Sequence, residues 1–349
     1  MKRSDGMESA HNPHIGVMCM DMAKSLEKHL GVGIWHSYLP VSYVKQLESV
    51  GAVVIPIWIG RERAYYEAIM QLVNGVLLPG GAVLLDDKKP PEHPHLTNDC
   101  VTAARHIYEI AMAKNAAGEY FPVWGTCLGF QLMMINAAGT KEVRTTCRKP
   151  RFEALPLQLS RDYAESQLFA GQPDELAQEM GREPFACHQH RYCITESELR
   201  HYKLHEDWHV LATRDDEDNA PRFVTLIEHR KYPIAGAQFH PEKVAYELLF
   251  AKPDNCRESH TAECIKLAQH FANFFVSACR RNANRFASAE QQACHMICNW
   301  QPVFCGKFIH SHWLECYLFK QHVDYPRECR SLATSEAAPA VATEATAVP

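Results

Sequence analysis

The chain has 349 residues, of which 46% are hydrophobic and 22% are charged. This composition is typical of folded globular domains and excludes a largely disordered protein. The 36 basic and 41 acidic residues give a net charge of −5 without a basic block, which argues against nucleic acid as a partner. No apolar run approaches the roughly 20 residues that a membrane-spanning helix needs, so we expect no membrane association. We expect the partner to be a small molecule.

The two ends of the chain differ in composition from the rest. Residues 1–13 are polar and unpatterned, and residues 331–349 form a low-complexity stretch of Ala, Thr, Pro and Glu. Such segments bury too little apolar surface to offset the entropy lost on ordering. The sequence therefore predicts flexible tails at 1–13 and 331–349 around one folded domain at 14–330.

The location of the protein is suggested only by weak signals. The N-terminus lacks the apolar core of a signal peptide, and no Asn stands in an Asn-x-Ser/Thr glycosylation motif. Fourteen cysteines are too dilute for a disulfide scaffold and are compatible with free thiols in a reducing compartment. These features favour a cytoplasmic location.

Short apolar runs alternate with helical patterns in the first half of the folded part. We predict strands at 14–20, 52–57, 75–81 and 120–124, each followed by a helix, at 41–50, 64–73, 96–114 and from within 125–131. Parallel neighbours require such crossover connections, so this order predicts an α/β fold with a parallel central sheet flanked by helices.

The pattern changes after residue 150. Predicted strands at 208–214, 222–228 and 234–239 are joined by turn-forming clusters, and a helix is predicted at 262–280. We therefore expect the single α/β domain to carry a β elaboration.

Cys127 stands between Gly125 and Gly129, where a buried strand runs into a helix. This is the setting of a nucleophile elbow with cysteine in place of serine. The glycines fit because the elbow backbone is strained and closely packed. The positive end of the helix favours thiolate over thiol, so we predict an exposed nucleophile here; a buried structural cysteine is the alternative.

Two other strand ends carry residues that suit the same chemistry. Gly80 and Gly81 close one apolar strand, and their main-chain N–H groups could join that of Leu128 in an oxyanion hole. His240 and Glu242 close another strand. The carboxyl ends of neighbouring parallel strands converge where open α/β sheets bind ligands, so we expect these residues to meet.

The chain resembles the γ-glutamyl hydrolases, which are folylpolyglutamate hydrolases of the class I glutamine-amidotransferase-like superfamily. The resemblance covers roughly 14–285 in family order and rests on the stretches PHIGVMCM, NGVLLPGG, PVWGTCLGF and QFHPEK. It implies a flavodoxin-like three-layer fold and a cysteine-type hydrolase. The implied substrate is a folylpoly-γ-glutamate or γ-glutamyl peptide, cleaved with water through a thioester. We expect no cofactor, and the oligomeric state stays open, with a homodimer as one alternative.

The resemblance also assigns roles to individual residues. It implies Cys127 as the nucleophile, His240 as its base and then acid, and Glu242 as the carboxylate that orients His240. It further implies Gly81 and Leu128 as oxyanion amides.

Three residues are implied to lie near the substrate, namely Tyr43, Gln131 and His188. Gln131 is a departure, because γ-glutamyl hydrolases carry Glu four residues after the nucleophile, whereas glutamine amidotransferases carry Gln. It lies one helical turn from Cys127 and could contact the glutamyl α-amino group through its amide.

Several alternatives stay open at this point. The histidines and cysteines at 187–193 resemble a metal site, but their spacing fits zinc poorly, and we expect none. Cys294 and Cys298 are expected in the packing face of a helix, and the acidic run at 215–218 as a solvated turn. The rival functions are a glutaminase that supplies ammonia to a separate synthetase chain and an inactive binding protein. The family's usual lysosomal, vacuolar or secreted location conflicts with the cytoplasmic signals.

Overall fold

The computed structural model describes residues 12–83, 85, 97–215, 222–248, 259–308 and 311–321. The predicted tail at 331–349, most of the tail at 1–13 and most of the acidic turn lie outside these residues.

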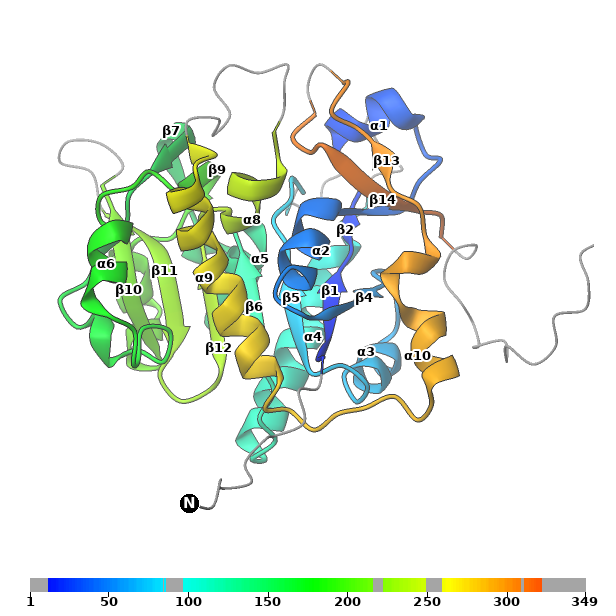
Figure 1. Ribbon diagram of the computed structural model, residues 1–349, viewed down its shortest axis with the longest axis horizontal. Helices are drawn as coiled ribbons and strands as arrows, with labels where there is room; N and C mark the ends of the chain where they lie inside the picture. Colours follow the sequence, from blue (N-terminus) through cyan, green and yellow to red (C-terminus); the bar gives the residue numbers. More distant parts are fainter. Residues whose placement is uncertain are drawn as a thin grey trace, which may run out of the picture.

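The central sheet has eight strands (Figure 1). Its order is β4 (Val53–Ile57), β1 (His14–Met18), β5 (Gly75–Leu78), β6 (Val123–Thr126), β12 (Ile234–Ala237), β11 (Phe223–His229), β10 (Trp208–Arg214) and β8 (Gln158–Leu159). The first five strands run parallel, and the last three continue the sheet in antiparallel pairs. Strands β1, β5, β6 and β12 are buried throughout, as expected for parallel strands covered on both faces.

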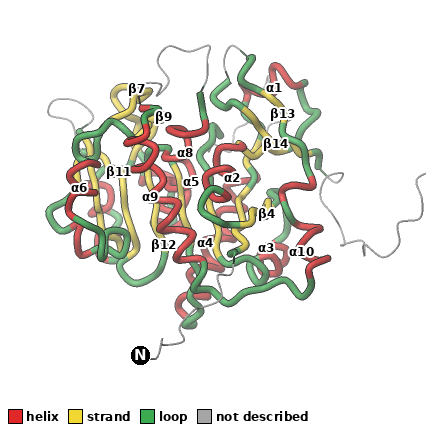
Figure 2. Tube along the Cα trace, viewed as in Figure 1, coloured by secondary structure: helices red, strands yellow, loops and turns green. Residues whose placement is uncertain are grey.

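Helices lie on both sides of this sheet, which makes three layers (Figure 2). One side carries α2 (Val41–Glu48) and α9 (Ala262–Cys279), which contact each other, and the other side carries α4 (Asp99–Ala116) and α5 (Leu128–Ala138). The remaining α-helices are α1 (Lys24–Leu30), α3 (Arg63–Ile69), α6 (Asp174–Met180), α7 (Glu196–His201), α8 (Pro241–Tyr246) and α10 (Ala289–His295). Short 3₁₀ helices lie at Lys141–Val143, Tyr163–Glu165, Leu204–Glu206 and Ile297–Asn299.

Two smaller sheets complete the fold. One is antiparallel, in the order β13 (Val303–Phe304), β14 (Glu315–Phe319), β3 (Ser37–Pro40) and β2 (Met20–Asp21). The other pairs β7 (Thr145–Leu155) with β9 (Ala186–Cys193). The C-terminal strands therefore pair with a strand from the N-terminal part, an arrangement that the sequence did not indicate.

The predicted parallel sheet, its flanking helices and the β elaboration are confirmed. The prediction of one strand over 14–20 is wrong, because the chain leaves the central sheet after Met18 and β2 joins the smaller sheet. The prediction that Cys294 and Cys298 share the packing face of a helix is wrong for Cys298, which lies after α10 and is exposed, whereas Cys294 lies in α10 and is half-buried. No helix in the described part of the chain has the length and apolar character needed to cross a membrane.

Candidate active site

The residues predicted to act together follow three adjacent strands of the central sheet. Gly80 follows β5, Cys127 follows β6 and His240 follows β12, and these strands are neighbours. A Cβ atom added to Gly80 would lie 2.6 Å from His240 Cε1, 2.9 Å from the Tyr43 hydroxyl and 3.2 Å from Cys127 Cβ. The structure thus brings three candidate residues, Tyr43, Cys127 and His240, together around this glycine.

Cys127 occupies a strained turn between β6 and α5. Its backbone has φ 51° and ψ −105°, a region that L-residues rarely adopt. The turn is held by its main-chain N–H, which donates to the Ala237 carbonyl at 2.7 Å. Gly129 permits the turn, since a Cβ there would lie 2.0 Å from the Leu78 carbonyl oxygen. The strand-turn-helix geometry of an elbow is therefore present.

The expectation that Cys127 is exposed is wrong. Its side chain is 4% exposed. The reason is that β9 passes over the turn, so that the thiol donates to the main-chain carbonyl of Gln189 at a sulfur–oxygen distance of 3.8 Å. Nothing in the elbow motif indicates this second, distant strand.

His240 and Glu242 form a buried pair at the start of α8. His240 Nδ1 lies 2.7 Å from Glu242 Oε1, and the two side chains are 6% and 1% exposed. The carboxylate accepts from Nδ1–H, which leaves Nε2 as the nitrogen that can exchange a proton with a thiol. Burial alone lowers the pKa of His240, but the negative charges of Glu242 and a Cys127 thiolate outweigh it and raise this pKa to about 9.

Tyr43 links α2 to this pair. Its hydroxyl accepts from the Gly80 N–H at 2.8 Å and lies 3.4 Å from His240 Nδ1. Burial, together with the charges of Glu242 and Cys127, raises the pKa of the Tyr43 phenol well above its usual value. The phenol is therefore neutral and can only donate or accept a hydrogen bond.

The two amides predicted for an oxyanion hole lie at the same edge. Leu128 is the first residue of α5 and Gly81 follows Gly80. Neither main-chain N–H donates a hydrogen bond to any residue that the structure describes. Two such main-chain donors, one of them at the start of a helix, are suited to an anionic oxygen.

Gln131 is held by protein groups on all sides. Its amide nitrogen donates to the Tyr192 carbonyl and to Gln238 Oε1, both at 2.9 Å, and its oxygen accepts from Arg144 at 3.0 Å. Both amide hydrogens are thus used within the protein. Contact between Gln131 and a substrate amino group stays a prediction.

His188 lies within a row of side chains along β9. Its Nδ1 is 3.1 Å from His190 Nε2, and His190 Nδ1 is 3.1 Å from the Tyr192 carbonyl. Because a carbonyl only accepts, His190 carries its proton on Nδ1, and His188 donates to His190 Nε2. The neighbouring Cys187 carbonyl accepts from the His240 N–H at 2.8 Å, which ties this strand to the catalytic pair.

The structure also shows the state of the cysteines among the described residues. No group of three or more Cys, His, Asp or Glu side chains among them has the arrangement of a metal site. Cys187 is disulfide-bonded. Free thiols occur at Cys19, Cys100, Cys127, Cys264, Cys279, Cys298, Cys305 and Cys316.

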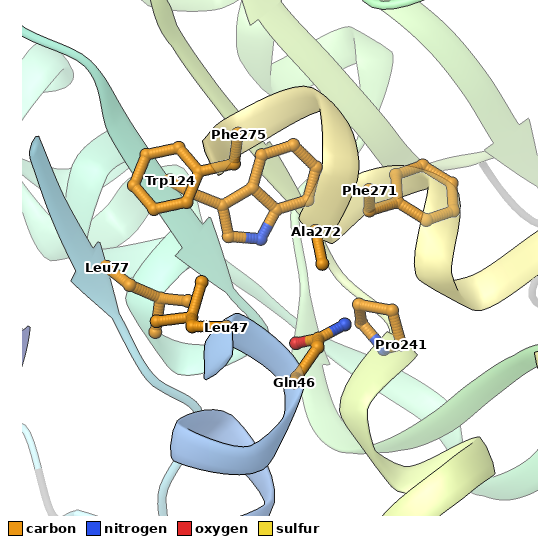
Figure 3. A pocket seen from close by; sticks show the side chains of 8 residues that line it. All are labelled: Gln46, Leu47, Leu77, Trp124, Pro241, Phe271, Ala272 and Phe275. Atoms are coloured by element: carbon orange, nitrogen blue, oxygen red, sulfur yellow. The ribbon is translucent and has the colours of Figure 1, made fainter. Parts of the chain in front are cut away.

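Figure 3 shows the residues that line a small apolar cavity. Neither His240 nor Glu242 is among them. Pro241 is its only lining residue from the segment 240–242. The lining residues are Gln46, Leu47, Leu77, Trp124, Pro241, Phe271, Ala272 and Phe275. The cavity contains no nucleophile, so we do not assign substrate binding to it.

Comparison with known proteins gives related hydrolases. The Peptidase C26 family model matches residues 13–242. The chain is 31% identical to the gamma-glutamyl hydrolase of Homo sapiens, over 89% of this chain and 91% of that protein. It is 29% identical to gamma-glutamyl hydrolase B of Dictyostelium discoideum, over 88% and 83%. A solved structure, the glutaminase domain of Trypanosoma brucei CTPS with bound acivicin, is 13% identical with a TM-score of 0.47, over 78% of this chain and 95% of that one.

Proposed function

This chain belongs to the Peptidase C26 family, and we propose that its Cys127, His240 and Glu242 hydrolyse γ-glutamyl bonds. The observation that carries the proposal is the buried His240–Glu242 pair, 2.7 Å between Nδ1 and Oε1, beside a cysteine on a strained elbow. The names of the relatives supply the bond type, since both are gamma-glutamyl hydrolases.

The reaction follows from the chemistry of these groups. His240 Nε2 takes the proton of the Cys127 thiol, and the thiolate attacks the γ-carbonyl carbon of a glutamyl residue. The tetrahedral intermediate collapses as His240 gives its proton to the leaving amine, which leaves a thioester on Cys127. A water molecule then gives a proton to His240 and attacks the thioester, and the returned proton restores the thiol.

The surrounding residues are proposed to stabilise the intermediates of this reaction. Glu242 fixes the imidazole orientation and stabilises the imidazolium that forms twice in the cycle. The main-chain N–H groups of Gly81 and Leu128 are proposed to bind the oxyanion of the tetrahedral intermediate. Tyr43 and His188 are proposed to lie along the bound substrate.

The proposed substrate is a folylpoly-γ-glutamate or another γ-glutamyl peptide. The sequence resemblance to folylpolyglutamate hydrolases supports this assignment. A glutaminase would use the same three side chains, but both curated relatives described above are named gamma-glutamyl hydrolases and not glutaminases. A higher kcat/KM on glutamine than on pteroyl-diglutamate would favour the glutaminase.

The direct test is Cys127→Ala. We expect it to abolish hydrolysis of pteroyl-pentaglutamate, with a loss on the order of 10⁴-fold or more in kcat. Cys298→Ala is the matched control, because this thiol is exposed and free, and it should keep full activity. Product chain lengths would show the bond that is cleaved, and turnover by Cys127→Ala would exclude this residue as the nucleophile.

A further inference from the structure

Residues 311–314 come from beyond the segment matched by the family model and lie against the catalytic site. The Lys243 ammonium, next to Glu242 in sequence, donates to the His312 carbonyl at 2.9 Å. The Leu314 N–H donates to Glu247 on the chain just after α8, at 2.5 Å. This short segment is thereby fixed to the helix that begins with the catalytic pair.

The same segment also contacts the strand that covers Cys127. The Gln189 amide nitrogen lies 2.6 Å from His312 Nδ1. An amide nitrogen only donates, so Nδ1 is the acceptor and the neutral imidazole carries its proton on Nε2. His312 therefore bridges α8, through its carbonyl, and β9, through its ring.

Gln189 connects His312 to the nucleophile, because it contacts both residues. Its main-chain carbonyl is the group that accepts from the Cys127 thiol, at 3.8 Å. A carbonyl oxygen in this place restrains the sulfur to one orientation. The position of the carbonyl depends on how firmly residue 189 is held.

We propose that His312 is a positioning residue for the reaction: by holding the Gln189 side chain, it fixes the Gln189 carbonyl beside the Cys127 sulfur. The inference rests on the proposed role of Cys127 as nucleophile. In this arrangement the sulfur is held in one orientation for attack on the γ-carbonyl carbon. Loss of the contact releases the carbonyl, so the sulfur is poorly aligned for attack and more open to a small alkylating reagent.

The test compares His312→Ala with His312→Asn, whose side-chain oxygen can still accept from Gln189. The full-length variants are assayed for kcat and KM on pteroyl-diglutamate and for the rate at which iodoacetamide alkylates Cys127, read by mass spectrometry of the Cys127 peptide. We expect His312→Ala to lower kcat about tenfold with KM within about twofold. Alkylation of Cys127 should become about threefold faster.

His312→Asn should recover most of the kcat and slow the alkylation again, and His205→Ala, at an exposed histidine, should match wild type in both measurements. Because Cys127 is buried, a general loss of structure would also lower kcat and speed alkylation, so the melting temperature of His312→Ala must match that of wild type for the effect to count as local. An unchanged kcat in His312→Ala would overturn the proposal, as would a fall in kcat with alkylation unchanged or slower. If wild type hydrolyses no γ-glutamyl substrate, the proposed function fails, while the alkylation rates still decide whether His312 controls the thiol.

Discussion

Gly80 shows how closely the catalytic side chains pack around one main-chain position. Its N–H donates to Tyr43, and the space where a side chain would stand is taken by Tyr43, His240 and Cys127. Contacts of 2.6 to 3.2 Å leave no room for a methyl group. The sequence places a glycine pair at this strand end, but only the fold shows that the first glycine, as well as the second, is required.

Gly80→Ala should therefore damage catalysis more than folding. We expect kcat/KM to fall about 100-fold or more, because a displacement of about 1 Å at a reacting group costs this much. Gly181→Ala is the matched control, since the nearest atoms to a Cβ there lie at 3.5 Å and its φ is −77°. Kinetics and thermal melting of both variants check the prediction, and a Gly80→Ala enzyme with wild-type kinetics would contradict the packing described here.

The raised pKa of His240 sets a pH limit on the proposed reaction. With this pKa at about 9, the imidazolium that protonates the leaving amine persists up to that pH and is lost as the pH rises through it. The pH profile of kcat/KM should therefore fall above about pH 9. Glu242→Gln removes one of the charges that raise this pKa, so the fall should move to lower pH. An alkaline limb at the same pH in both enzymes would exclude His240 as the group that titrates.

At the scale of the elements, the central sheet could be predicted and the smaller sheets could not. Strand β1 is an uninterrupted apolar run, and β4 follows the glycine that ends the preceding helix, so local sequence is sufficient. Strand β3 has only four residues and its last is Pro40, which is a weak strand signal. It is a strand because Leu39 and its neighbours pair with β14, more than 270 residues away.

The same distinction applies to the site. Cys127, His240 and Glu242 carry local motifs that are visible in the sequence, whereas the contact of Gln189 with Cys127 depends on where β9 crosses the elbow. His312 carries no motif, and its contact with Gln189 spans 123 residues. Local motifs indicate the reacting groups, whereas the residues that position these groups are identified only from the fold.

Glu247, just after α8, makes stability depend on pH. Burial raises the pKa of this carboxyl from 4.5 to about 7, although Lys243 and the Leu314 N–H oppose the rise and Glu242 adds to it. The folded state thus holds a proton that the unfolded chain has lost, so stability falls as the pH rises from about 4.5 to 7. By linkage, the loss reaches up to about 3 kcal/mol above pH 7.

Glu247→Gln removes this pH dependence, because the amide oxygen still accepts from Leu314 and carries no charge. The melting temperature of the variant minus that of wild type should increase from pH 5 to about pH 7 and level off by pH 8. Glu175→Gln, at an exposed position on α6, should give a constant difference. The assignment fails if the Glu247→Gln difference is equally constant.

The C-terminal strands pack against the N-terminal part of the molecule. Strand β14 pairs with β3, and the buried Phe319 ring packs 4.7 Å from Trp58, which follows β4. Trp313 packs 4.9 Å from Tyr38, whose hydroxyl in turn lies near Gly81. Strand β14 therefore supports the edge of the fold, and Trp313, which precedes it, supports the loop proposed to bind the oxyanion.

Two truncations separate this structural part of the chain from the low-complexity stretch beyond it. A chain that ends at Pro302 lacks β13 and β14. It also loses the buried side chains of Trp313, Leu318 and Phe319 and exposes the residues that they pack against. Burial of each of these three side chains contributes about 1.5–3 kcal/mol. We expect its melting temperature to fall by roughly 10 °C or more. A chain that ends at Arg330 removes only the low-complexity stretch of Ala, Thr, Pro and Glu, and we expect its melting temperature and kcat to match those of the full chain. Thermal melting of the three proteins decides the point, because equal melting temperatures at Pro302 and Arg330 would mean that the C-terminal strands do not stabilise the fold.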